Sequence, residues 1–251
     1  MKTSHIFPCY IHRRCMLPPH LVLSMLCYAM LCYAIFAVLL FEKTVREETI
    51  KLLAKGGHPI AFMTFANRDI DIQRDEDEPK VYGKVIIELF DDICPLAVQN
   101  FLQLCTGEKG EVIVDEATGN TAKLHYEKCP IHRVVPNGWI QCGDVVDGSG
   151  LNSFAAVNEQ GKFRDESFSV DFGAELGGVV GYSSNDTHSN GSQFFVTLGP
   201  CGWMNNKSVG FGRIVQGFPV LQAIAAAECN NQRPKPDIII QSCGQMRMKI
   251  D

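Results

Sequence analysis

The stretch that most constrains the fold covers residues 129–144 and reads C-P-I-H-R-V-V-P-N-G-W-I-Q-C-G-D. β-Branched residues precede a Pro-Asn-Gly break and an apolar pair follows it, which predicts two short strands joined by a turn. Arg133 and Gln141 lie among apolar neighbours. A charge and an amide in such surroundings are costly without a partner or a ligand. Taken alone, the stretch allows either a structural arginine that bonds strand-end carbonyls or a binding site.

The rest of the chain is read as mainly β with two helices. Pro95 and Pro219 each begin an apolar segment with helical spacing, because the fixed φ of proline suits a first helical turn. The predicted helices cover residues 95–105 and 219–227. Strands are predicted at 60–65, 85–90 and 238–240, and a long polar loop at 108–123. Many short strands with two helices indicate a β-barrel with helices at its ends.

Composition excludes several classes of protein. Hydrophobic residues make up 46% of the chain, which is enough for a sizeable core. The net charge is −5 and no stripe of basic residues occurs, so we expect no nucleic-acid partner. The eleven cysteines are odd in number and form no C-x-x-C pair, which argues against a disulfide scaffold or a zinc site. Reduced, mostly buried thiols fit better.

An uncharged segment at residues 21–41 is long enough to cross a bilayer, because 21 helical residues span about 30 Å. We expect a single-pass membrane anchor. One alternative is a signal peptide, although no small-x-small cleavage site follows. The other is that residues 1–41 are not part of the expressed protein, which would leave a cytoplasmic domain.

The expected organisation has five parts. They are an N-terminal segment at 1–20, the anchor at 21–41, a juxtamembrane linker at 42–58, a folded domain at 59–246 and a tail at 247–251. Glycosylation sequons at Asn185, Asn190 and Asn206 fall in or beside the candidate groove, where a glycan would obstruct binding. With the unpaired cysteines, this favours a cytosolic domain.

Separate motifs along residues 59–246 together resemble the cyclophilins, the cyclosporin-binding peptidyl-prolyl cis-trans isomerases. The three main ones are H-R-V-V-P at 132–136, N-G-S-Q-F-F at 190–195 and W-M-N-N-K-S-V-G-F-G at 203–212. Shorter matches occur at 88–91, 100–110, 124–126 and 165–168. The resemblance implies a closed eight-stranded antiparallel β-barrel capped by two α-helices, preceded here by the hydrophobic N-terminal helix.

The resemblance also implies isomerase activity on X-Pro bonds of peptides and proteins, assisting protein folding. Such a bond isomerises over a barrier of about 20 kcal/mol, because amide resonance is lost as the bond twists. A catalyst therefore needs an apolar slot for the proline ring and a strong donor aimed at the prolyl nitrogen. It needs no nucleophile, metal or cofactor, and we expect none.

The family's site residues carry over position by position. Arg133 matches the catalytic arginine, with Gln141 orienting the substrate carbonyl and Phe195 flooring the proline slot; alternation along the strand turns Phe194 the other way. The substrate-binding positions are Trp139, Ser183, Ser184, Gln193, Trp203, Met204 and Ser208. Each also has an ordinary structural explanation, such as core packing for Phe195 and Met204.

Several positions depart from the family pattern. Gly138 stands where an aromatic wall of the slot is usual, Trp139 replaces a methionine, and Ser208 replaces a histidine. These changes predict a divergent branch, with isomerisation slower than that of a standard cyclophilin. The alternative is a weak or inactive module that binds proline peptides. The expected partners are proline-containing peptides or proteins and weakly bound cyclosporin, and we expect a monomer.

Overall fold

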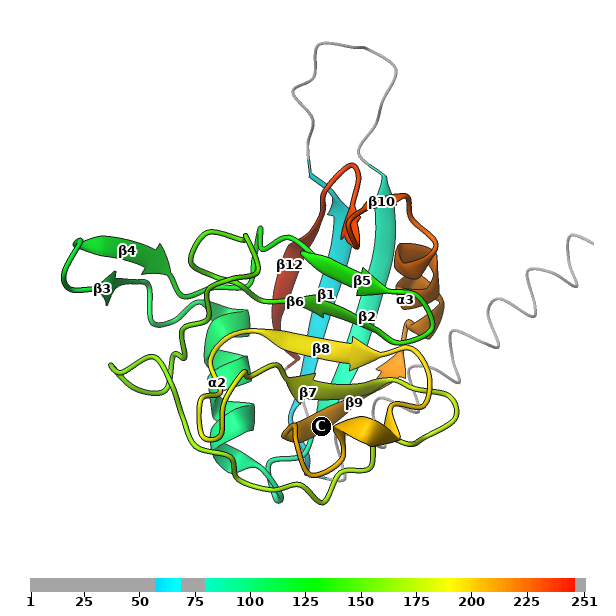
Figure 1. Cartoon of the computed structure of the whole chain (residues 1–251), viewed down its shortest axis with the longest axis horizontal. Helices are drawn as coiled ribbons and strands as arrows, with labels where there is room; N and C mark the ends of the chain where they lie inside the picture. The colour runs from blue at the N-terminus through cyan, green and yellow to red at the C-terminus, as the bar shows by residue number, and fades with distance from the viewer. Residues whose placement is uncertain (1–56, 69–79, 247–251) are drawn as a thin grey trace, which may run out of the picture. The chain divides into compact units, whose positions relative to one another are not determined.

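The computed structural model describes residues 57–68 and 80–246 (Figure 1). The expected anchor at 21–41, the tail at 247–251 and most of the linker lie outside these residues. So does all but the last residue of the charged run at 74–80. Among the described helices, none has the length and apolar character needed to cross a bilayer.

Eight strands form one curled antiparallel sheet in the order β12-β1-β2-β9-β7-β8-β6-β5 (Figure 1). Their bounds are β1 Ile60–Asn67, β2 Val81–Leu89, β5 Arg133–Val135, β6 Trp139–Cys142, β7 Val179–Tyr182, β8 Phe194–Thr197, β9 Gly210–Gln216 and β12 Ile238–Met246. Both short strands predicted in the central stretch are present as β5 and β6. The prediction of a mainly β, eight-stranded antiparallel domain is confirmed.

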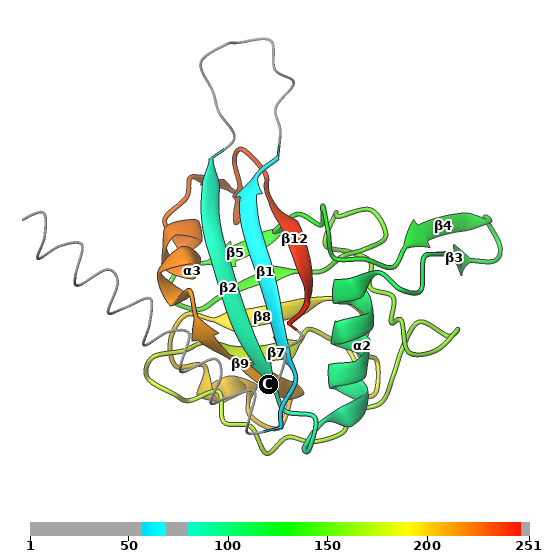
Figure 2. The same ribbon diagram turned by 180° about the vertical axis from the view of Figure 1, so that it is seen from behind.

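Two helices lie at opposite sides of the curled sheet, α2 (Pro95–Thr106) and α3 (Phe218–Ala225) (Figures 1 and 2). Both begin with proline in the first turn, as predicted, and their bounds differ from the prediction by one or two residues. Gly107 ends α2 in the left-handed region, with φ of 67°. The free amides at the start of α2 are bonded by a distant side chain: Leu96 and Ala97 donate to the Glu166 carboxylate at 3.0 and 2.7 Å.

The main core lies between the two helices and the concave side of the sheet. Phe101 of α2 is fully buried, with ring centres of Tyr126, Phe194 and Phe211 at 5.1 to 5.4 Å. Phe194 belongs to this core. The next residue, Phe195, belongs instead to a second, smaller apolar cluster. The alternation predicted for β8 is therefore confirmed, and it separates the structural core from the candidate site.

Two small hairpins and one 3₁₀ turn complete the fold. The hairpin of β3 (Glu111–Asp115) and β4 (Asn120–Lys123) stands out from the sheet where a polar loop was expected (Figures 1 and 2). Its strands pair with each other in a separate sheet. The second hairpin joins β10 (Cys229–Asn230) to β11 (Arg233–Pro234), and the 3₁₀ turn η1 covers Gly202–Met204.

Candidate functional site

Three neighbouring strands bring the expected catalytic residues side by side. Arg133 of β5 pairs with Gln141 of β6, and Gln141 pairs with Phe195 of β8. Arg133 and Gln141 are eight positions apart in the sequence, and Gln141 and Phe195 are 54 apart. The three residues thus form one row across the sheet. The arrangement follows from the Pro-Asn-Gly turn, because its length sets the register between β5 and β6.

A polar groove of about 760 Å³ runs beside this row. Of the predicted site residues, Arg133, Gln141, Ser183, Ser184 and Gln193 line it. The prediction missed other lining residues, among them His132, Asn152, Lys162, Asn231 and Gln232. Most of these come from loops, whose positions depend on tertiary contacts and carry no periodic signal in the sequence.

Hydrogen bonds between side-chain amides fix the floor of the groove. Gln141 Nε2 donates to Ser183 Oγ at 3.0 Å and to Gln193 Oε1 at 2.9 Å. Gln193 Nε2 in turn donates to the carbonyls of Gly150 and Asn152 at 3.0 and 2.8 Å. This network joins β6 to the loop over residues 145–152, so the groove is preorganised on that side.

Arg133 is held by a residue that the sequence did not indicate. Its Nε donates to Gln232 Oε1 at 2.8 Å, and its guanidinium carbon lies 5.1 Å from the centre of a Trp139 ring. Gln232 sits in the β10–β11 turn with φ of 68°, and its carbonyl accepts the Val134 amide at 2.6 Å. Gln141, which pairs with Arg133 across the two strands, bonds to Ser183 and Gln193. The guanidinium is therefore directed by the turn and stacked on an indole.

The apolar side of the site is a small buried cluster, and Trp139 packs against it. The second apolar cluster consists of Phe172, Val179, Phe195, Cys201 and Met204. Phe195 and Met204 are only 3% and 4% exposed, and Trp139 packs against the cluster. Gly138 beside it offers no side chain. The indole thus occupies the outside of what the family uses as a proline slot.

Trp203, by contrast, faces solvent. It is 58% exposed, and its ring meets that of Trp139 edge to face at 5.6 Å between centres. Ser208 lies beyond η1 and donates its amide to the Met204 carbonyl at 3.1 Å. It is not among the residues that line the groove. The structure therefore divides the predicted site into a polar groove, a covered apolar cluster and an exposed indole.

A buried carboxylate shapes the loop that borders the groove. Asp144 follows β6 and is 1% exposed. Its Oδ1 accepts the amides of Val146 and Asp147 at 3.0 and 3.3 Å, and its Oδ2 accepts those of Gly150 and Asn152 at 2.8 and 3.2 Å. Such bonds replace the water that the carboxylate and the amides lose on burial. Sequence reasoning did not single out Asp144, although an acid before a glycine- and serine-rich turn is a usable signal.

His132, which precedes Arg133, is held in its neutral form. Burial lowers the pKa of its imidazole, and among the described residues neither ring nitrogen has a hydrogen-bond partner. Because the unfolded chain binds this proton more readily, protonation favours unfolding. Above the ordinary histidine pKa of 6.5, His132 is neutral in both the folded and the unfolded chain, and the free energy of unfolding carries no penalty from its protonation. As the pH falls below that value, the unfolded chain takes up the proton first and the free energy of unfolding decreases.

Replacing this side chain should reduce the acid sensitivity of the fold. We expect wild type to lose more free energy of unfolding between about pH 7 and about pH 5 than His132→Gln does. Denaturant unfolding at the two pH values measures the difference. Lys162→Gln, at an exposed groove position without an imidazole, is the control and should lose as much as wild type. Equal losses in wild type and His132→Gln would contradict the assignment.

Comparison with known proteins identifies the fold family. Residues 70–245 match the profile described as cyclophilin type peptidyl-prolyl cis-trans isomerase/CLD. A Bos taurus protein is 38% identical over 164 residues, which cover 65% of this chain and 50% of the relative. A Homo sapiens protein is 39% identical over 152 residues, covering 61% and 46%. The chain thus spans about half the length of the curated relatives that it matches.

Both relatives are called probable inactive peptidyl-prolyl cis-trans isomerase-like 6, as is a Mus musculus protein that is 38% identical over 152 residues. The comparison supports the expected divergent branch. It contradicts the expectation that this chain is an active isomerase. In the structure Trp139 packs against the cluster that holds Phe195 and Met204, and the Arg133 Nε donates to Gln232.

Proposed function

The chain belongs to the cyclophilin-type peptidyl-prolyl cis-trans isomerases, and we propose that it binds proline-containing peptide segments without accelerating their isomerisation. The observation that carries this proposal is the division of the site. A preorganised polar groove is open, whereas the apolar cluster proposed for the proline ring is almost fully buried, with Trp139 packed against it. Binding and catalysis need different parts of such a site.

Catalysis needs contacts that are stronger in the twisted state than in the ground state. In a cyclophilin these contacts require a proline ring held deep in the slot and a donor above its nitrogen. Here Phe195 and Met204 are almost fully buried, and the Arg133 Nε is bonded to Gln232. A peptide that rests on the surface of Trp139 and Trp203 meets the same contacts in either isomer. It is therefore bound without being driven towards the twisted state.

The same surface suits a peptide in the ground state. The Trp139–Trp203 pair gives an exposed aromatic platform of the kind on which proline rings pack in other peptide-binding modules. The groove beside it offers the charged head of Arg133 for backbone carbonyls, and the Oε1 atoms of Gln141 and Gln193 for backbone N–H groups. Weak cyclosporin binding remains part of the proposal, because Trp203 is exposed while Gly138 and Ser208 remove contacts next to it.

Titration calorimetry with a short proline peptide tests the binding. We expect saturable binding to the full chain and no saturable binding of the same peptide with alanine for proline. Arg133→Ala should weaken binding roughly 10- to 100-fold, the usual worth of a charge-assisted hydrogen bond. Arg164→Ala, at an exposed arginine outside the groove lining, is the control and should bind as wild type does.

A protease-coupled assay on the same peptide tests the second half of the proposal. We expect the spontaneous isomerisation rate at every protein concentration. A rate that rises with wild-type protein and not with Arg133→Ala would refute the proposal. Equal affinity for the proline and alanine peptides would refute it too.

We further propose that the curled sheet closes into a barrel, as the family implies. Support comes from the two end strands. Pro130, which precedes β5, forms a β-bridge with Ile239 of β12. On either side of it, Ile131 donates to the Ile238 carbonyl at 2.8 Å and Ile240 donates to the Cys129 carbonyl at 3.0 Å. These bonds cover the edges that an open sheet would expose.

A further inference from the structure

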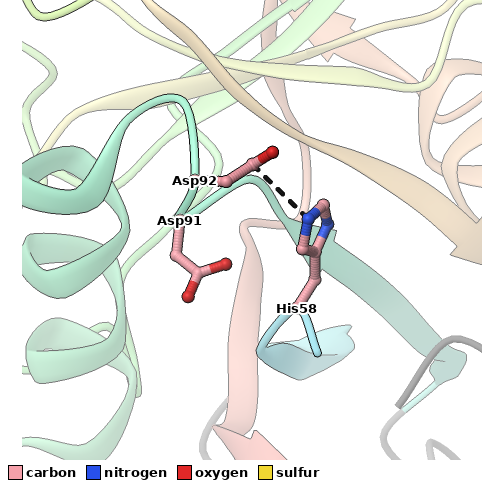
Figure 3. A group of neighbouring side chains, drawn as sticks. All are labelled: His58, Asp91 and Asp92. Atoms are coloured by element: carbon pink, nitrogen blue, oxygen red, sulfur yellow. Dashed lines mark ion pairs between the residues drawn. The ribbon is translucent and has the colours of Figure 1, made fainter. Parts of the chain in front are cut away.

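A group of metal-ligating side chains lies away from the groove, where the chain enters β1. His58 precedes β1, and Asp91 and Asp92 follow β2 in the turn that leads to α2 (Figure 3). One ligand atom from each lies within 4.8 Å of the other two. His58 Nε2 is 3.4 Å from Asp92 Oδ1, and in Figure 3 the two groups point at each other.

The other side of the same imidazole also faces a carboxylate. His58 Nδ1 lies 3.3 Å from Glu88 Oε1. Glu88 is 7% exposed, and its Oε2 accepts a 2.7 Å hydrogen bond from Arg213 Nε. A neutral imidazole carries one proton, so in either tautomer one ring nitrogen presents a lone pair to a carboxylate oxygen. That contact is repulsive unless a cation, either a second proton or a metal ion, lies between the two groups.

We propose that His58, Asp91 and Asp92 bind a divalent zinc-class cation, with Glu88 orienting the histidine. Ligands at 2.0 to 2.1 Å from a tetrahedral Zn²⁺ lie about 3.3 Å apart, which matches the distance from His58 Nε2 to Asp92 Oδ1. Asp91 reaches the ion by a side-chain rotation, and water fills the fourth position. An imidazole ligand favours Zn²⁺ over Mg²⁺ or Ca²⁺, which prefer oxygen ligands alone.

Glu88 Oε1 lies 3.3 Å from His58 Nδ1, near the place that an outer carboxylate takes in many metal sites, although among the described residues this nitrogen makes no hydrogen bond. A ligating histidine commonly gives its second ring N–H to such a group, which fixes the ring. Backbone bonds hold the ligands in place as well: the Leu89 amide donates to the Pro59 carbonyl at 3.0 Å, and Ile60 pairs with Glu88. The ion would join the start of β1 to the turn after β2, at the point where the preceding chain meets the domain.

Metal titration of the full chain tests the site. We expect one Zn²⁺ site whose affinity falls at least tenfold in His58→Ala and in Asp92→Asn, and about tenfold in Glu88→Gln. His188→Ala is the matched control, because His188 Nδ1 also lies against one carboxylate, Asp165, at 3.2 Å. It should bind Zn²⁺ as wild type does. Circular dichroism of each variant shows that a loss of affinity is not a loss of fold.

Cysteine thiolates also bind Zn²⁺, so a second measurement must separate them from the site at His58. Co²⁺ bound at His58 has nitrogen and oxygen ligands, so its spectrum should show d–d bands without thiolate-to-metal charge transfer. A charge-transfer band for the tightest Co²⁺ would place the metal on cysteines and overturn the proposal. Equal Zn²⁺ affinity in wild type and His58→Ala would overturn it, as would displacement of Zn²⁺ by equimolar Mg²⁺ or Ca²⁺. Absence of Zn²⁺ binding would overturn it as well.

Discussion

Asp144→Ala is expected to lower the free energy of unfolding by about 3 kcal/mol, because it leaves four part-buried amides without an acceptor. The amides of Val146, Asp147, Gly150 and Asn152 all donate to this carboxylate. Each buried donor that is left unpaired costs about 1 to 3 kcal/mol, although water entering the new cavity recovers part of the loss. Denaturant unfolding monitored by circular dichroism measures the change.

Asp147→Ala is the control for this experiment. Asp147 lies in the same loop and is exposed, and it accepts the Ser149 amide at 2.9 Å. Its removal should cost less than about 1 kcal/mol, because water replaces the lost bonds. Asp144→Ala should also weaken peptide binding, since the 145–152 loop borders the groove. If the two variants are equally stable, the loop does not depend on the buried carboxylate.

Trp139→Met is expected to strengthen binding of the proline peptide by about tenfold. The substitution replaces the covering indole with the residue usual in the family, which uncovers Phe195 and Met204. A proline ring that enters this space buries about three methylene or methine groups, each worth about 0.8 kcal/mol at full burial. Lost contacts with the indole offset part of that gain. Calorimetric titration of wild type and variant with one peptide measures the ratio.

Trp203→Met, the same substitution at the tryptophan that contacts Trp139, should change the peptide affinity in the opposite direction. Trp203 is exposed, so Trp203→Met removes platform area and opens no buried space. We expect weaker binding from that variant. If Trp139→Met also weakens binding, the indole contributes more as a contact surface than as a cover.

The row across β5, β6 and β8 could be predicted because local patterns specify it. The Pro-Asn-Gly break sets the β5–β6 turn, and alternation in β8 puts Phe194 in the core and Phe195 at the site. Helix starts at proline and the helix end at Gly107 follow from backbone restrictions of single residues. Such features require no knowledge of distant parts of the chain.

The contacts that direct Arg133 could not be predicted in this way. Gln232 is 99 residues away and reaches Arg133 only because the β10–β11 turn packs beside β5. The sequence left open whether Trp139 fills the slot, since that depends on side-chain packing around Gly138. The β3–β4 hairpin was missed for another reason: its strands pair away from the core, so burial imposes no apolar alternation on them.

The contact between Trp139 and Trp203 has an optical consequence. The chain contains two tryptophans, and both are in this pair, with ring centres 5.6 Å apart. All indole emission of the unlabelled protein therefore originates at the candidate site, from two chromophores close enough to exchange excitation. A ligand on this surface displaces water from Trp203 and alters the geometry of the pair. The wavelength and intensity of intrinsic fluorescence thus report on occupancy of the groove, with no added dye.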